Sequence, residues 1–191
     1  MKKPAKVRLS KIVDHQQRPF TLSAYDPDWK KQYELKAAHL RQILEPEVVS
    51  IEHVGSTAVN GMMAKPQIDI LVTVHNLAKI KAYYEPLAVA GFSARGDYTG
   101  EGEEYFTEDD EGGKRLSSIH VLPEGHVWAQ DLLNVRDYLR SHPAAATAYS
   151  ASKQTAYQEH GGDYNAYYRA KLSAIQTLRQ QAADWRAESE N

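Results

Sequence analysis

The chain has 191 residues, of which 42% are apolar and 25% charged, with a formal net charge of -2 and no cysteine. This length suits one well-packed domain and is short for two. The charge argues against a surface built to bind duplex nucleic acid or an anionic membrane, and the lack of cysteine excludes disulfides, thiolate metal sites and cysteine nucleophiles and fits a cytoplasmic protein.

The first 20 residues are basic but lack the apolar stretch of a secretory signal, so we expect a tail or an edge segment there. No apolar run approaches the roughly 20 residues of a membrane helix. No repeat or low-complexity linker divides the rest. We therefore predict one domain over residues 21–188.

The first predicted helix begins at Asp26-Pro27, with Asp26 as N-cap and proline at the first helical position, and ends before Pro46. A short strand is expected over Val48–Val54, broken at Gly55. Gln67–Val74 gives the clearest strand pattern, because apolar residues alternate along it.

The middle of the chain continues with a predicted helix over 77–90, which Gly91 closes. Residues 94–114 predict turns around a possible strand at Tyr105-Phe106. Leu116–Leu122 is a strand with Ser118 and His120 on one face. The last third predicts three helices, over 127–140, 144–160 and 163–188. The expected fold is α/β (α+β), a mixed sheet with 48–54, 67–74 and 116–122 as neighbours, flanked by helices, and a helical C-terminal third.

The segment from His53 to Ile70 carries the chemistry. A strand ends, Gly55 and Ser56 make a tight turn, and the next strand delivers Asp69. Glycine lets the backbone approach a ligand, and turn amides with the Ser56 and Thr57 hydroxyls suit phosphate oxygens. Asp69 would hold a divalent cation beside them. The alternative is a structural turn whose hydroxyls cap the following helix.

This stretch, HVGSTAVNG with AKP and IDI after it, resembles the signature of the GrpB family. Further matching residues extend the resemblance over about 22–178: they are Tyr25-Asp26-Pro27, Trp29, Arg136–Arg140, His142-Pro143, Tyr149, Lys153, Asp163, Tyr167 and Lys171. The resemblance implies a nucleotidyltransferase-like scaffold. Related domains also occur fused to dephospho-CoA kinases, which implies a part in supporting the folding of such a kinase.

The sequence departs from the family pattern in three places. Asn60 stands where proline is usual, and Ser118 replaces the first histidine of a His-x-His pair that ends at His120. Glu103 and Glu104 lie where an arginine is usual. The last change reverses the charge of that loop.

The sequence also lacks one of the carboxylates that a working nucleotidyltransferase needs. Nucleotidyl transfer usually uses two carboxylates at positions i and i+2 of one strand, so that both lie on one face. If Asp69 is the first, the second position is Leu71, which has no carboxylate. His120 is the best further ligand, with Glu52 or His53 as weaker ones. Asp69 with His120 would suit zinc or manganese better than magnesium. Alternatively, Asp69 is a buried carboxylate satisfied by Lys65 or by turn amides.

Basic residues offer a second anion-binding group. Arg136 and Arg140 share a helix face and with Lys153 or Lys171 could form an anion pocket against the sheet, while Lys65 could neutralise phosphate. Ion pairing of the arginines with neighbouring acids is the alternative.

Three functions follow from these residues. The first is a module that binds a nucleotide, a CoA-like molecule or another phosphate ligand with little or no transfer. The second is an active nucleotidyl or phosphoryl transferase that uses Asp69 and His120 on Mg²⁺, Mn²⁺ or Zn²⁺. The third is a chaperone-like module for a protein partner such as dephospho-CoA kinase.

Overall fold

The structure is a computed structural model and describes residues 20–189, so the predicted tail, except Phe20, lies outside the described residues. The strands are β1 (Val48–Val54), β2 (Ile68–Val74), β3 (Ser93–Gly96), β4 (Glu104–Asp109) and β5 (Arg115–Pro123). The α-helices are α1 (Asp28–Leu44), α2 (Tyr84–Val89), α3 (Val127–Ser141), α4 (Pro143–His160), α5 (Tyr164–Ala170) and α6 (Leu172–Ser189), and the 3₁₀ helices are η2 (Ser56–Ala58) and η3 (Leu77–Tyr83).

The five strands form one mixed sheet in the order β1-β2-β5-β4-β3. β2 runs parallel to β5, and the other neighbouring pairs are antiparallel. The predicted neighbours, residues 48–54, 67–74 and 116–122, are therefore confirmed. The register places Asp69 beside Ser118 and Leu71 beside His120, so these four residues share one face of the sheet.

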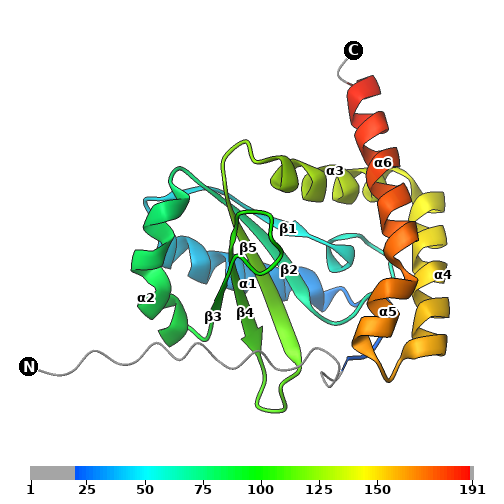
Figure 1. The fold of residues 1–191 in the computed structure, drawn as a ribbon, viewed down its shortest axis with the longest axis horizontal. Helices are drawn as coiled ribbons and strands as arrows, with labels where there is room; N and C mark the ends of the chain where they lie inside the picture. The colour runs from blue at the N-terminus through cyan, green and yellow to red at the C-terminus, as the bar shows by residue number, and fades with distance from the viewer. Residues whose placement is uncertain (1–19, 190–191) are drawn as a thin grey trace, which may run out of the picture.

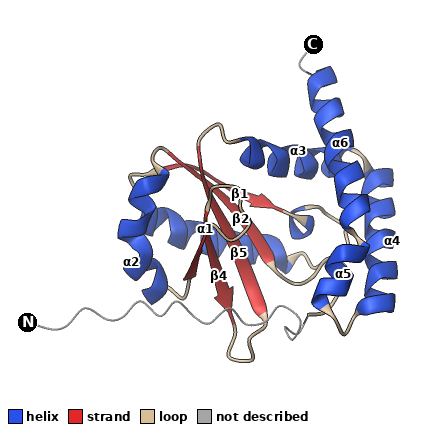
Figure 2. Cartoon of the chain, viewed as in Figure 1, coloured by secondary structure: helices blue, strands red, loops and turns tan. Residues whose placement is uncertain are grey.

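Helices cover both faces of the sheet (Figures 1 and 2). One face, which carries Ile70 and Val72, packs against α1 and α2 in the largest apolar cluster. On the other face, Leu71 and Leu122 pack with Ala129 of α3. α4, α5 and α6 stand together at one side of the sheet. This is the mixed sheet with a helical C-terminal third that the sequence predicts.

Three predicted helices differ in detail. The helix expected over 77–90 is η3 followed by α2, because Pro86 has no N–H to donate inside a continuous helix and is tolerated only in the first turn. The helix expected from Pro27 begins at Asp28, although the Asp26 carboxylate still accepts the Asp28 N–H at 2.9 Å. The helix expected over 163–188 is divided at Lys171 into α5 and α6, and no glycine or proline marks that break.

The segment 94–114 holds more strand than the sequence suggests, because β3 and β4 form an antiparallel pair at the sheet edge.

The described part of the chain contains no helix long and apolar enough to cross a membrane.

Candidate functional site

The turn between β1 and β2 is built around Gly55. Its φ is +73°, a conformation that glycine adopts without strain. A side chain would also find no room, because an ideal Cβ would lie 2.4 Å from Oδ2 of Asp69. The turn backbone therefore lies directly against the carboxylate, and the predicted pairing of the Gly-Ser turn with Asp69 is present.

The two hydroxyls of the turn have different surroundings. Thr57 is buried, donates to the Gln67 carbonyl at 3.3 Å, and lies 3.0 Å from Nε2 of His53. Ser56 is half-buried, and its Oγ accepts a hydrogen bond from Nζ of Lys153 at 2.9 Å. Ser56 is thus the hydroxyl that contacts a lysine, whereas Thr57 contacts His53 and the Gln67 backbone.

Lys153 belongs to α4 and is only 2% exposed. Besides Ser56, its ammonium group donates to the Met63 carbonyl. Lys65 and Lys171 also approach this region: Lys65 donates to the Tyr164 hydroxyl at 2.9 Å, and Lys171 lies over the Tyr167 ring at 5.1 Å from its centre. We call Lys65, Lys153 and Lys171 the lysine cluster.

The charges of the lysine cluster act on one another. Burial, together with Lys171 and Lys65, lowers the pKa of Lys153 to about 7, although Asp69 opposes the shift. Burial and Lys65 lower the pKa of Lys171 to about 8, again against the effect of Asp69. The protein thus concentrates positive charge beside the Gly-Ser turn at an electrostatic cost.

Asp69 is half-buried and accepts a hydrogen bond from an amide side chain. Nε2 of Gln67 donates to its Oδ1 at 2.8 Å and to Oγ of Ser118 at 2.9 Å. Ser118 also lies 2.7 Å from the Tyr105 hydroxyl. The amide bridge from Gln67 is a partner of this carboxylate that the sequence reasoning did not foresee.

His120 lies on the same face as Asp69, one side-chain position further along, beside Leu71. Its Nδ1 is 2.7 Å from Oε2 of Glu103, a side chain with no exposed surface. The carboxylate that meets His120 is therefore Glu103 and not Asp69. The sequence signal for this contact is the acidic residue in a loop where the family pattern has arginine.

The residues from 20 to 189 contain no group of three or more histidine, aspartate or glutamate side chains that could hold a metal ion. Asp69 and His120 have separate partners, Gln67 and Glu103, and the described residues supply no third ligand. These residues do not fit a two-carboxylate metal centre. Metal binding by Asp69 and His120 stays a prediction.

Arg136 and Arg140 do not join the lysine cluster. Arg136 donates to Glu52 at 2.7 Å and to Asp137 at 2.8 Å. Arg140 donates twice to the Ala58 carbonyl, from Nε at 3.0 Å and from Nη2 at 2.9 Å. The shared pocket of arginines and lysines is thus replaced by two separate groups, and ion pairing accounts for Arg136. Burial, together with these arginines, lowers the pKa of His53 to about 4.

The sequence matches the GrpB protein family over residues 19–181. The chain is 29% identical to UPF0157 protein YqkA of Bacillus subtilis over 88% of this chain and 49% of that protein. It is also 29% identical to a dephospho-CoA kinase of Mycolicibacterium paratuberculosis, over 87% of this chain and 47% of that protein. The chain thus spans about half the length of these two relatives.

A crystal structure of conserved protein GrpB from Enterococcus faecalis has a similar fold. It superposes with a TM-score of 0.81 at 30% identity, over 85% of this chain and 96% of that chain.

Proposed function

Because this chain belongs to the GrpB family, on a sheet that carries a Gly-Ser turn beside an aspartate, we propose that it binds a phosphate-bearing small molecule and transfers little or nothing from it. Gly55, Ser56 and Thr57 would form the turn at which phosphate binds. The lysine cluster would neutralise the ligand's charge. A nucleotide and a CoA-like molecule are the ligand classes with this chemistry.

The observation that carries the proposal is the contact between Lys153 and Ser56, 2.9 Å between Nζ and Oγ. A lysine at 2% exposure normally requires a charge partner, because burial of an isolated ammonium is costly. Here the protein gives Lys153 a hydroxyl and a carbonyl, and places two further lysines near it. Asp69 is the acid that acts on this cluster, and a bound phosphate would supply further negative charge.

Two other features support an anion at this place. Gly55 brings the turn backbone close to the site, and such turns bind anions through their amides. Tyr167 lies under Lys171, and its buried hydroxyl has no hydrogen-bond partner among the residues that the structure describes. This hydroxyl belongs to a side chain that contacts the cluster and could donate to a ligand there.

Weak transfer is proposed because the second acid is missing. Leu71 occupies the i+2 position after Asp69, is fully buried, and packs with Ala129 of α3. No carboxylate from β2 can therefore stand beside Asp69. Charge that develops on phosphate oxygens during transfer needs metal ions or equivalent positive groups at fixed positions. Lysines can bind the ground state, but they do not replace the acids that hold two metals.

The proposal is tested by thermal unfolding with ATP, coenzyme A and pyrophosphate, each with and without Mg²⁺, Mn²⁺ and Zn²⁺. A ligand at 100 times its Kd adds about 2.7 kcal/mol to the stability of the folded state. We expect stabilisation by at least one ligand, its loss in Lys153→Met, and its reduction in Ser56→Ala. Lys31→Met removes the same charge from an exposed site on α1 and should keep the effect. Equal stabilisation of both lysine variants would contradict the proposal.

A partner role is the second candidate, and the similarity to a dephospho-CoA kinase over 47% of that protein favours it. The rest of that relative lies outside the match. A separate dephospho-CoA kinase chain could therefore be the partner of the present protein. The test is co-elution of this chain with a dephospho-CoA kinase encoded in the same genome, and the yield of active kinase after refolding with and without it. No co-elution and an unchanged yield would exclude this role.

A further inference from the structure

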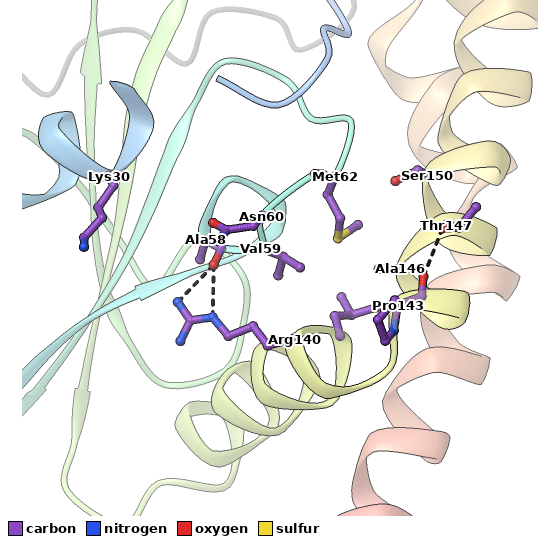
Figure 3. A pocket seen from close by; sticks show the side chains of 12 residues that line it. Lys30, Ala58, Val59, Asn60, Met62, Arg140, Pro143, Ala146, Thr147 and Ser150 are labelled. Carbon is purple, nitrogen blue, oxygen red and sulfur yellow. Dashed lines mark hydrogen bonds between the residues drawn. The ribbon is translucent and has the colours of Figure 1, made fainter. Parts of the chain in front are cut away.

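A pocket of about 660 Å³, which no residue of the lysine cluster lines, lies between the segment after η2, the end of α3 and the first half of α4 (Figure 3). Lys30 of α1 stands at its other side. This volume is within the range of small-molecule sites, about 300–1,000 Å³. Ser56, Asp69 and Lys153 do not line the pocket, so it is distinct from the phosphate site proposed above.

The pocket has an apolar floor and a polar rim. Val59, Met62, Leu139 and Ala146, which belong to one buried apolar cluster, form the floor. The rim carries hydrogen-bonding and cationic groups, namely Asn60, Thr147, Ser150, Lys30 and Arg140. Among the residues that line the pocket none is acidic, although the whole chain has a net charge of -2. The rim therefore favours an anionic group and the floor an apolar one.

Arg140 is positioned for such a group. Its Nε and Nη2 both donate to the Ala58 carbonyl (Figure 3), which uses one edge of the guanidinium and fixes its plane. The other edge, formed by Nη1 and the second hydrogen of Nη2, matches the two oxygens of a carboxylate. Asn60 is fixed in a similar way, because its Oδ1 accepts the Tyr25 hydroxyl at 2.8 Å, and its amide hydrogens are the donors left for a ligand.

The acids near the rim are engaged mainly by other cations: Glu52, whose charge also acts on Arg140, pairs with Arg136 at 2.7 Å. Asp137 lies 3.9 Å from Nη1 of Arg140, but it is closer to Arg136 at 2.8 Å and to Arg186 at 3.1 Å. One carboxylate is thus shared by three guanidinium groups, and Arg140 is the most distant. Lys30 is 4.0 Å from Glu34 in an exposed pair, which contributes little to neutralisation because solvent screens it.

We propose that this pocket binds a small organic carboxylate with a hydrophobic body, of the class of medium-chain fatty acids. The carboxylate lies on the free edge of Arg140 with Lys30 beside it, and the body covers Val59, Met62 and Leu139. The apolar contact and the ionic contact both contribute to the affinity, and the cations select an acid over an alcohol.

The test uses three probes measured by isothermal titration calorimetry at pH 7. Octanoate has both the charge and the body, octanol has only the body, and acetate has only the charge. We expect octanoate to bind more tightly than either of the others. Octanol that binds as tightly as octanoate, or no binding of octanoate, would overturn the proposal.

Two variants with matched controls locate the site. Thr147→Tyr places a ring at the rim and should weaken octanoate binding by about ten-fold or more, whereas Thr155→Tyr, also exposed on α4, should leave it unchanged. Lys30→Gln should weaken it by about three-fold, and Lys31→Gln should not. The positions changed by both Thr147→Tyr and Lys30→Gln are exposed, so folding should survive, and circular dichroism checks it.

A separate variant distinguishes this pocket from the lysine cluster. Lys153→Met should leave octanoate binding intact even where it abolishes phosphate binding. Octanoate binding that is lost in Lys153→Met but kept in Thr147→Tyr would place the acid in the cluster and refute the pocket.

Discussion

Gly55 and Asp69 fit together so closely that no side chain has room at position 55. A Cβ at Gly55 would lie 2.4 Å from Oδ2 of Asp69 and 3.0 Å from its Cβ. The contact joins the end of β1 to the start of β2. It fixes the carboxylate against the turn backbone and so defines where a ligand phosphate would sit relative to Asp69.

Gly55→Ala should therefore destabilise the fold through both strain and overlap. Gly61 is the matched control, because its φ is +77° and a Cβ there meets nothing within 4 Å. We expect Gly61→Ala to cost about 1 kcal/mol from backbone strain alone. Gly55→Ala should cost about 2–4 kcal/mol, since a clash is added. Urea denaturation measures both, and equal losses would show that the turn moves away from Asp69.

Lys153 should make the unliganded protein less stable as the pH falls. Its pKa in the folded state is lowered to about 7 from an ordinary value of 10.5, so between these values the unfolded chain binds more protons. Stability from this group must then rise as the pH increases from about 7 to about 10. In Lys153→Met this rise should be reduced. Denaturation at pH 7, 8, 9 and 10 compares the slopes, and identical slopes would contradict the burial of a titrating lysine.

Anion binding should be coupled to proton uptake. A bound dianion favours the charged form of Lys153 and Lys171, whose pKa values are lowered to about 7 and about 8. Sulfate is a suitable probe because it does not titrate in this range. At pH 8 we expect binding to take up protons, seen as a calorimetric enthalpy that varies with the buffer's ionisation enthalpy. Affinity should fall as the pH rises from about 6 to about 9, and a flat profile would argue against the lysine cluster.

Transfer from a nucleoside triphosphate should be weak or absent. Asp69 has Leu71 at the second-acid position, and His120 is bound to Glu103. Radiolabelled triphosphates with candidate acceptors under Mg²⁺, Mn²⁺ or Zn²⁺ should show no robust turnover. Turnover that disappears in Asp69→Ala would support the transferase instead. Ligand binding should also be little changed by the metals, since amides, hydroxyls and lysines supply the contacts.

The sequence alone determined the local features. Alternation of apolar residues predicted β2 and β5, and their shared face with Asp69, Ser118 and His120 is present. The sequence also predicted the tight turn at Gly55 and Ser56 before the strand that carries Asp69. These features depend on backbone period and turn chemistry, which are set by residues close in the chain. Pro86 is a local reason for the division of residues 77–90 into η3 and α2, because it has no N–H to donate.

Tertiary structure decided which charges meet. Lys153 reaches Ser56 across 97 residues, and Arg140 reaches Ala58 across 82. A shared pocket of arginines and lysines was one of two possibilities from the sequence, and the packing of α3 and α4 instead gives Arg140 and Lys153 different partners, Ala58 and Ser56. Similarly, the carboxylate that contacts His120 belongs to Glu103 and not to Asp69. Glu103 directly precedes β4, which pairs with β5. Helix rotation and strand order fix these contacts. They depend on how the whole core packs, which no short stretch of sequence encodes.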